Sequence, residues 1–237
     1  MDNWEQATLQ KVLLETITEQ RRARRWRIFF KLLVVALIGW GFWSAYGSGE
    51  TGDDNKTGPQ VAVVDFKGVI DGDSQNYLTV IDGVTKALKD KKTVAVLIRA
   101  NSPGGSPVYS DILNNELTRL RKLYPTKPID FVVEEVCASG CYYAAAAADK
   151  VYASPASIVG SIGVIYTRFG ATEAMKKLGL ESRLIISGKN KAMGFPFVPE
   201  NKDQTAMQQK MLDEVHGQFI DAVKRGRGSK LGADPDL

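Results

Sequence analysis

The sequence predicts an α/β domain with a mainly parallel sheet, preceded by one transmembrane helix. Short β-branched segments alternate with helical patterns from residue 60 onward. The expected strands are Val61–Phe66, Val94–Ala100, Ile129–Val136 and Arg183–Ser187. The expected helices are Asn76–Lys89, Tyr109–Leu123, Gly140–Ala148, Ala171–Leu178 and Gln204–Lys224. Because the first two strands are apolar on both faces, we expect them to be covered on both sides, with right-handed crossovers between them.

Composition excludes several classes of protein. The chain has 237 residues, 44% of them apolar and 24% charged, which is typical of one globular domain with a short appendage. A single histidine argues against most zinc sites and most Ser-His-Asp triads. The net charge is +4, and residues 1–31 hold seven basic against four acidic side chains. The remainder is nearly neutral, so we expect no nucleic-acid partner.

The predicted transmembrane helix is Ile28–Tyr46, a run of 19 residues in which Lys31 is the single charge. A helix needs about 17–25 apolar residues to cross a bilayer. Arginines precede the run and acidic residues follow it, which predicts a cytoplasmic N-terminus and an extracytoplasmic domain, as in a single-pass inner-membrane protein. A buried core helix and a cleavable signal peptide are the alternatives, and the missing polar face and the long charged prelude oppose them.

These observations divide the chain into four parts. Residues 1–27 form a cytoplasmic basic segment, and residues 28–46 form the span. Residues 47–59 are polar and rich in glycine, which is typical of a flexible linker. Residues 60–237 form the globular domain.

Two segments that follow predicted strands have compositions that packing alone does not require. Arg99–Pro107 contains a Pro-Gly-Gly turn, whose backbone N–H groups are able to bind an oxyanion or to form only a plain tight turn. In Val136–Tyr143, Ser139 lies between a predicted strand and a predicted helix of small residues. A serine at this position is either a nucleophile or a helix cap. Chemistry in open α/β sheets gathers beyond the carboxyl ends of strands.

A nucleophilic serine here needs a base other than histidine. His216 lies in an amphipathic helical stretch, which is typical of a half-buried or solvated helix residue. The nucleophile pattern G-x-S-x-G also fails, because residue 137 is cysteine. A lysine serves as a base when burial lowers its pKa. Lys189 and Lys191 both follow the predicted strand Arg183–Ser187, and the chemistry of the residues leaves either possible.

Cys137 and Cys141 flank Ser139. Neither has a partner ligand nearby in the sequence, and side chains four residues apart on one helix are poorly placed for a disulfide. We therefore expect both to be small apolar packing residues, and oxidation of the pair remains open for a domain outside the cytoplasm.

Taken together, six segments in order resemble the signal peptide peptidase A family, whose members are serine peptidases with a Ser-Lys dyad. The matching segments are VAVVDFKGVI from residue 61, Asn101–Ser106, Ala138–Tyr143, Gly160–Val164, Ser187–Lys191 and Phe219–Gly228. The resemblance implies a fold like that of Clp protease and the crotonase superfamily. It also implies a chain that ends before a further family segment.

Carried over residue by residue, the resemblance assigns Ser139 as nucleophile and Lys191 as general base, in preference to Lys189. It assigns Ser161 to the orientation of the lysine, and the N–H groups of Gly105 and Gly140 to the oxyanion hole. The family's A-S-G-G-Y reads here as A-S-G-C-Y, and the cysteine at the second helical position is expected to narrow that wall of the site.

The resemblance implies a membrane-anchored endopeptidase that degrades released signal peptides or other membrane-associated peptides. It implies a homo-oligomeric ring in which Ser139 and Lys191 come from neighbouring protomers, and no cofactor. The alternatives are an inactive membrane-anchored scaffold of the same fold and an acyl-CoA enzyme of the crotonase superfamily. The dyad argues against the first, and both the dyad and the anchor argue against the second.

Overall fold

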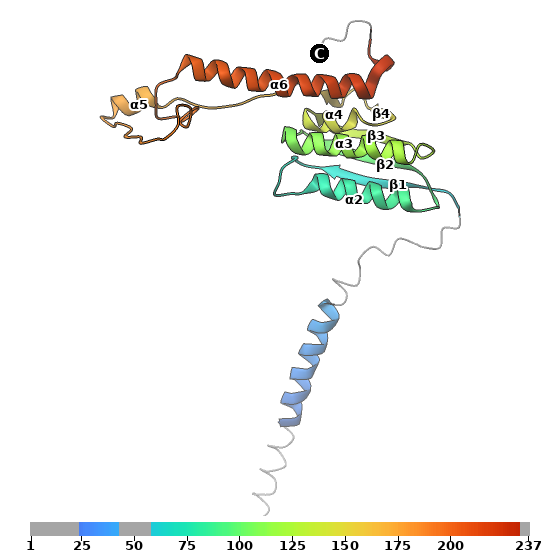
Figure 1. The fold of residues 1–237 in the computed structure, drawn as a ribbon. Coiled ribbons are helices and arrows are strands. Elements are labelled where there is room, and N and C mark those ends of the chain that lie inside the picture. Colours follow the sequence, from blue (N-terminus) through green and yellow to red (C-terminus); the bar gives the residue numbers. More distant parts are fainter. Residues whose placement is uncertain (1–23, 43–57, 233–237) are drawn as a thin grey trace, which may run out of the picture. The chain divides into compact units, whose positions relative to one another are not determined.

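The structure is a computed structural model that describes residues 24–42 and 58–232 (Figure 1). The chain divides into two units between Thr57 and Gly58, and each is described by itself. In the first unit, residues 24–42 form one helix with exposed side chains along its length. No helix within the described ranges combines the length and the apolar character needed to cross a bilayer. Residues 1–23 of the predicted basic segment, 43–46 of the predicted span and 47–57 of the predicted linker lie outside the described residues.

The second unit is built on a parallel sheet. The described residues form five strands: β1 Gln60–Lys67, β2 Thr93–Ser102, β3 Ile129–Ala138, β4 Lys150–Ala153 and β5 Ile158–Gly160. The order is β1-β2-β3-β4, and β5 pairs with the carboxyl end of β3, beyond β4. Every pairing is parallel, which confirms the predicted α/β class.

Five α-helices accompany the strands in this unit: α2 Asn76–Lys89, α3 Pro107–Leu123, α4 Gly140–Ala145, α5 Thr172–Lys177 and α6 Lys202–Arg227, with a short 3₁₀ turn at Gly228–Lys230 among the described residues. The main core lies between one face of the sheet and the apolar stripes of α2 and α3. A second, smaller cluster joins α4 to α6. Figure 1 shows α6 lying along α4, and α5 with its loops beyond the end of the sheet.

Three expectations about the elements were wrong. Arg183–Ser187 forms no strand, and Ile185 is 98% exposed. A β-branched segment becomes a strand only beside another strand, and none lies there in the described chain. The expected cover on both faces is also absent on β1, where the side chains of Val61 and Val63 are exposed. The helix expected to reach Ala148 ends at Ala145.

Candidate active site

Ser139 is the single residue between the end of β3 and the start of α4. Its backbone has φ +53° and ψ −123°, a conformation that non-glycine residues rarely adopt. Its N–H donates to the carbonyl of Gly160 at 2.8 Å, and its own carbonyl accepts from Tyr143 N–H at 2.9 Å. These bonds to β5 and to the first turn of α4 hold a sharp strand-to-helix turn. Ser139, at the apex of that turn, is half-buried.

The Pro-Gly-Gly turn is held on two sides. It follows the last residue of β2, Ser102, whose Oγ accepts from Gly104 N–H at 3.2 Å. Ile70 N–H donates to the carbonyl of Gly104 at 2.9 Å, and Ser106 N–H donates to the carbonyl of Ile70 at 2.8 Å. Gly104 has φ +94°, which favours glycine. The buried Ser102 was not among the predicted site residues, and its place as the serine directly before Pro103 was the available signal.

The glycine turn lies directly against the serine turn. A Cβ at Gly104 would come within 2.9 Å of the Ser139 Cβ and 2.6 Å of the Gly140 nitrogen. A Cβ at Gly140 would come within 3.2 Å of the Gly105 nitrogen and would overlap the hydroxyl of the buried Ser110. The two segments approach this closely because three glycines lack side chains.

The backbone N–H groups of Gly105 and Gly140 are free to bind a ligand. Within the described part of the chain, neither donates a hydrogen bond to another group. Two free N–H groups beside a serine are the arrangement that stabilises a tetrahedral oxyanion in acyl transfer. The structure thus brings together Ser139, Gly105 and Gly140.

Ser161 belongs to the same neighbourhood. It follows Gly160, the last residue of β5, whose carbonyl accepts from Ser139 N–H. Ser161 is exposed and also has a positive φ, +53°. The pairing of β5 with the end of β3 therefore carries this serine to the edge of the sheet at which Ser139 lies.

Lys191 is not brought to Ser139 within one chain. It lies exposed in the loop between α5 and α6, and its backbone N–H donates to the carbonyl of Gly188 at 3.1 Å. Figure 1 shows this part of the chain beyond the end of the sheet. Among the hydrogen bonds and ion pairs of the described residues, none joins Lys191 or Lys189 to Ser139. His216 is half-buried on α6, as expected of a helix residue.

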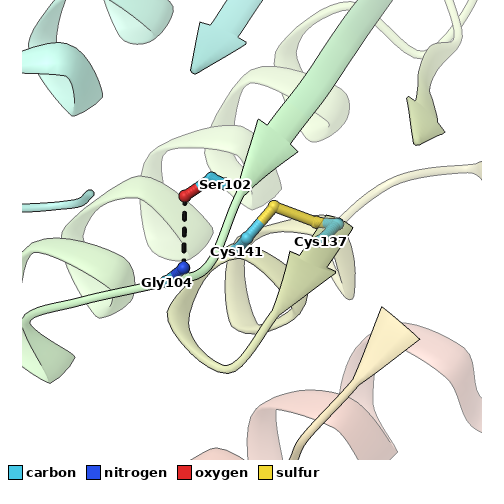
Figure 2. The surroundings of a disulfide bond; sticks show 4 residues. All are labelled: Ser102, Gly104, Cys137 and Cys141. Atoms are coloured by element: carbon cyan, nitrogen blue, oxygen red, sulfur yellow. Dashed lines mark hydrogen bonds between the residues drawn. A yellow bond between two sulfur atoms is a disulfide. The ribbon is translucent and has the colours of Figure 1, made fainter. Parts of the chain in front are cut away.

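The prediction for the two cysteines was wrong. Cys137 and Cys141 form a disulfide with their Cα atoms 5.1 Å apart (Figure 2). The prediction failed because the pair does not share a helix: Cys137 lies in β3, Cys141 lies in α4, and the turn at Ser139 folds one back towards the other. Both are fully buried in the main core, so the Cys141 sulfur is bonded within the core instead of narrowing an open wall.

Tyr143 anchors α4 to the helices on either side. Its hydroxyl donates to Asp111 Oδ1 at 2.9 Å, and its carbonyl accepts from Asn114 Nδ2 at 2.7 Å. Burial, together with the hydrogen bond to the Asp111 carboxylate, raises the pKa of Tyr143 well above its usual value. Tyr143 was not among the predicted site residues, although it stands fourth after Ser139. The described residues contain no group of three or more histidine, cysteine, aspartate or glutamate side chains suited to a metal ion.

A family model described as "Peptidase family S49" matches residues 121–234, a range that includes the serine turn, β5 and the lysine loop. Over these residues the chain is similar to peptidase family S49. This confirms the resemblance to the signal peptide peptidase A family, and the α/β sheet is consistent with a fold like that of Clp protease and crotonase.

Two of the three curated relatives described here carry protease names. The chain is 37% identical to "Putative protease MJ0651" of Methanocaldococcus jannaschii, over 65% of this chain and 48% of that protein. It is 32% identical to "Protease 4" of Haemophilus influenzae, over 71% of this chain and 28% of that protein. A 44% identical match covers 64% of this chain and only 20% of a Brucella melitensis protein named "Na(+)/H(+) antiporter NhaA". The chain thus spans about half or less of these relatives.

Proposed function

We propose that this chain is a membrane-anchored serine endopeptidase that uses a Ser-Lys dyad. The observation that carries the proposal is the approach of the Ser139 turn to two free backbone N–H groups, those of Gly105 and Gly140. A scaffold protein has no need for a strained serine beside an unoccupied pair of donors. The similarity to family S49 supports peptide hydrolysis as the reaction.

In the proposed mechanism, the neutral amine of Lys191 takes the proton of Ser139 as its Oγ attacks a peptide carbonyl. The carbonyl oxygen becomes an oxyanion and receives hydrogen bonds from the N–H groups of Gly105 and Gly140. Lys191 then gives the proton to the leaving amine, and water hydrolyses the acyl-enzyme. Ser161 orients the lysine. No cofactor takes part in these steps.

The base is proposed to come from a neighbouring protomer of a homo-oligomeric ring. Lys191 lies in an exposed loop that makes no hydrogen bond to Ser139 within the described part of one chain. The same region exposes large apolar side chains, including Ile165 at 87%, Phe169 at 71% and Ile185 at 98%. Exposed apolar surface of this kind supports association with a second copy.

The N-terminal segment is proposed to anchor the protein in the inner membrane, with the peptidase domain outside the cytoplasm. The helix of residues 24–42 exposes apolar side chains throughout, including Leu32 at 64% and Trp40 at 71%. The Cys137–Cys141 disulfide also supports an oxidising compartment. Peptides released into the membrane, such as cleaved signal peptides with small or aliphatic side chains near the cut, are the proposed substrates.

Hydrolysis of a fluorogenic peptide by the full chain in detergent micelles tests the proposal. We expect turnover by the wild-type protein and by Lys189→Ala, and loss of at least a hundredfold in Ser139→Ala and Lys191→Ala, since each removes a group that acts in the bond-breaking step. Activity that survives in Ser139→Ala would reject the nucleophile. A correctly folded wild-type protein without any turnover would favour the inactive scaffold.

A further inference from the structure

We infer that the Cys137–Cys141 disulfide is a redox-controlled clamp on the serine turn: its formation holds Ser139 in the reactive geometry, and its reduction slows acylation. The inference rests on the proposed peptidase function and adds a modification site to it. The disulfide lies next to both parts of the site, the serine turn and the glycine turn.

The first half is the serine turn. The disulfide joins residues that are four apart in the sequence, and Ser139 is the middle residue of the loop that it closes. A non-glycine residue with φ +53° persists only where its surroundings hold it there. A covalent bond across that residue removes backbone conformations that the turn would otherwise sample, so it stabilises the presentation of the Ser139 hydroxyl.

The second half is the glycine turn. In the parallel pairing of β2 with β3, Ser102 is the register partner of Cys137. The hydroxyl of Ser102 accepts from Gly104 N–H at 3.2 Å, and Figure 2 shows Ser102 and Gly104 beside the bonded cysteines. Gly104 in turn lies against Ser139. A shift of Cys137 should therefore displace its neighbour Ser102. Through the hydrogen bond between Ser102 and Gly104, it should also displace the turn that carries the Gly105 N–H group.

Because the Cys137–Cys141 disulfide is buried, its reduction should disturb the residues packed around it. Neither Cys137 nor Cys141 has exposed surface, and both belong to the main core. Two unbonded thiol sulfurs lie farther apart than the two sulfurs of a disulfide, and a close-packed core has little free volume to accommodate the difference. We therefore expect reduction to move the end of β3 and the start of α4 apart, with Ser139 between them.

The chemistry is dithiol–disulfide exchange. On oxidation each thiol loses a proton, an S–S bond forms between the two Sγ atoms, and two electrons pass to an external disulfide, which becomes two thiols. On reduction a thiolate of a dithiol reductant attacks one sulfur, and its second thiol releases the resulting mixed disulfide. Because the pair is buried, both reactions need the turn to open, so we expect the switch to be much slower than turnover.

The test compares the full chain in detergent micelles after incubation with dithiothreitol or with oxidised glutathione. Three quantities are measured: the rate of fluorophosphonate reaction at Ser139, kcat and KM for a fluorogenic peptide, and amide hydrogen exchange in residues 137–143. We expect reduction to slow the fluorophosphonate reaction by roughly 10- to 100-fold, because small displacements of reacting groups carry penalties of this size. The loss should fall on kcat, exchange should become faster, and reoxidation should restore all three values.

The double variant Cys137→Ala/Cys141→Ala is the control, since it should behave like the reduced protein and ignore both reagents. If it fails to fold, the reduced wild-type protein carries the test. Equal rates and equal exchange in the two redox states would overturn the inference, and so would a reduced protein that melts earlier but reacts at an unchanged rate. If neither state reacts with the fluorophosphonate while reduction still accelerates exchange, the peptidase proposal fails and the clamp on the turn stands.

Discussion

At the scale of single residues, the site depends on three glycines, which have no side chain. Gly104, Gly105 and Gly140 allow two backbone segments to approach closely, which is what the proposed oxyanion hole requires. A different neighbour leaves no room for a side chain at each glycine. An added Cβ would meet Ser139 at Gly104, Ile70 at Gly105 and the Ser110 hydroxyl at Gly140. The glycines are therefore required by packing as well as by chemistry.

We predict that Gly140→Ala lowers the free energy of unfolding by about 1–3 kcal/mol, the usual cost of forcing an extra methyl group into a packed site. The fluorophosphonate reaction should also slow by about tenfold or more, because the new Cβ would lie 3.2 Å from the Gly105 nitrogen. Thermal melts and labelling rates measure the two effects. Gly217→Ala is the matched control: its Cβ would meet nothing within 4 Å, so this change on α6 should stabilise the protein by about 0.5–1 kcal/mol.

The source of the Gly140→Ala penalty can be isolated with Ser110→Ala. This change removes the overlapping hydroxyl and leaves only the Ser110 Cβ, 3.3 Å from the new methyl group. The double variant should therefore be more stable than the sum of the two single changes by about 0.5–3 kcal/mol. If the stability changes of the two single variants simply add in the double variant, contact with Ser110 is not the cause of the destabilisation by Gly140→Ala.

At the scale of elements, Tyr143 ties the helix that follows Ser139 to its neighbours. The tyrosine lies on α4, donates to Asp111 on α3, and its ring centroid lies 4.7 Å from that of Phe219 on α6. A six-residue helix has few contacts of its own. The orientation of α4, and with it the serine turn, therefore depends on these partners.

Tyr143→Phe should destabilise the protein by about 1.5–3 kcal/mol, the usual value of a hydrogen bond to a charged group. Tyr142→Phe is the adjacent control, because the Tyr142 hydroxyl makes no hydrogen bond within the described residues, and it should leave the melting temperature nearly unchanged. Equal effects of the two changes would contradict this role of Tyr143.

The same tyrosine predicts a pH dependence. Burial raises the pKa of Tyr143 in the folded protein, whereas an unfolded tyrosine titrates near pH 10. The folded state thus holds the Tyr143 proton more tightly than the unfolded state does. The contribution of Tyr143 to the free energy of unfolding is therefore fully present below about pH 10 and is lost as the pH rises further. Denaturant melts from pH 8 to pH 11 should show this slope in the wild-type protein and a shallower slope in Tyr143→Phe.

The elements also show what the sequence can and cannot predict. Strands β1, β2 and β3 and helices α2 and α3 were predicted within about two residues, since their apolar patterns are long enough to read. Strands β4 and β5 were missed because four and three mostly exposed residues leave no pattern. The disulfide was missed because its geometry depends on the positive φ of Ser139, which converts a spacing unsuited to one helix into a close approach.

At the scale of the whole molecule, the proposed nucleophile and the proposed base lie in separate regions of one chain. The serine turn is part of the packed sheet, whereas the lysine loop belongs to an exposed region around α5. A sequence reveals which residue types are present, but it does not show which surface an exposed loop would meet in an assembly. The proposed ring supplies that partner.

Co-expression of Ser139→Ala and Lys191→Ala protomers tests the shared site. Each variant alone should be inactive, and random co-assembly should restore about a quarter of the wild-type activity, because that share of interfaces pairs an intact serine with an intact lysine. Mixed oligomers that remain inactive would place both dyad members in one chain. An active enzyme that elutes as a monomer in size-exclusion chromatography would also contradict the shared site.

Membrane attachment is testable in the helix of residues 24–42. Leu33→Arg with Val35→Arg should release the protein from sedimented membranes, because each arginine near the centre of a span costs about 2.5–3.5 kcal/mol. The same two charges at Val61 and Val63, exposed on β1, should leave it attached. Sedimentation of the Leu33/Val35 variant with membranes as complete as that of wild type would argue against this helix as the anchor.

Locating a fluorophosphonate adduct by mass spectrometry shows whether Ser139 is acylated and whether Lys191 assists. The proposed mechanism predicts one adduct, on Ser139, in the wild-type protein and in Lys189→Ala. It predicts none in Ser139→Ala and at least a hundredfold slower formation in Lys191→Ala. An adduct on another residue, or equal rates in Lys191→Ala and Lys189→Ala, would contradict it.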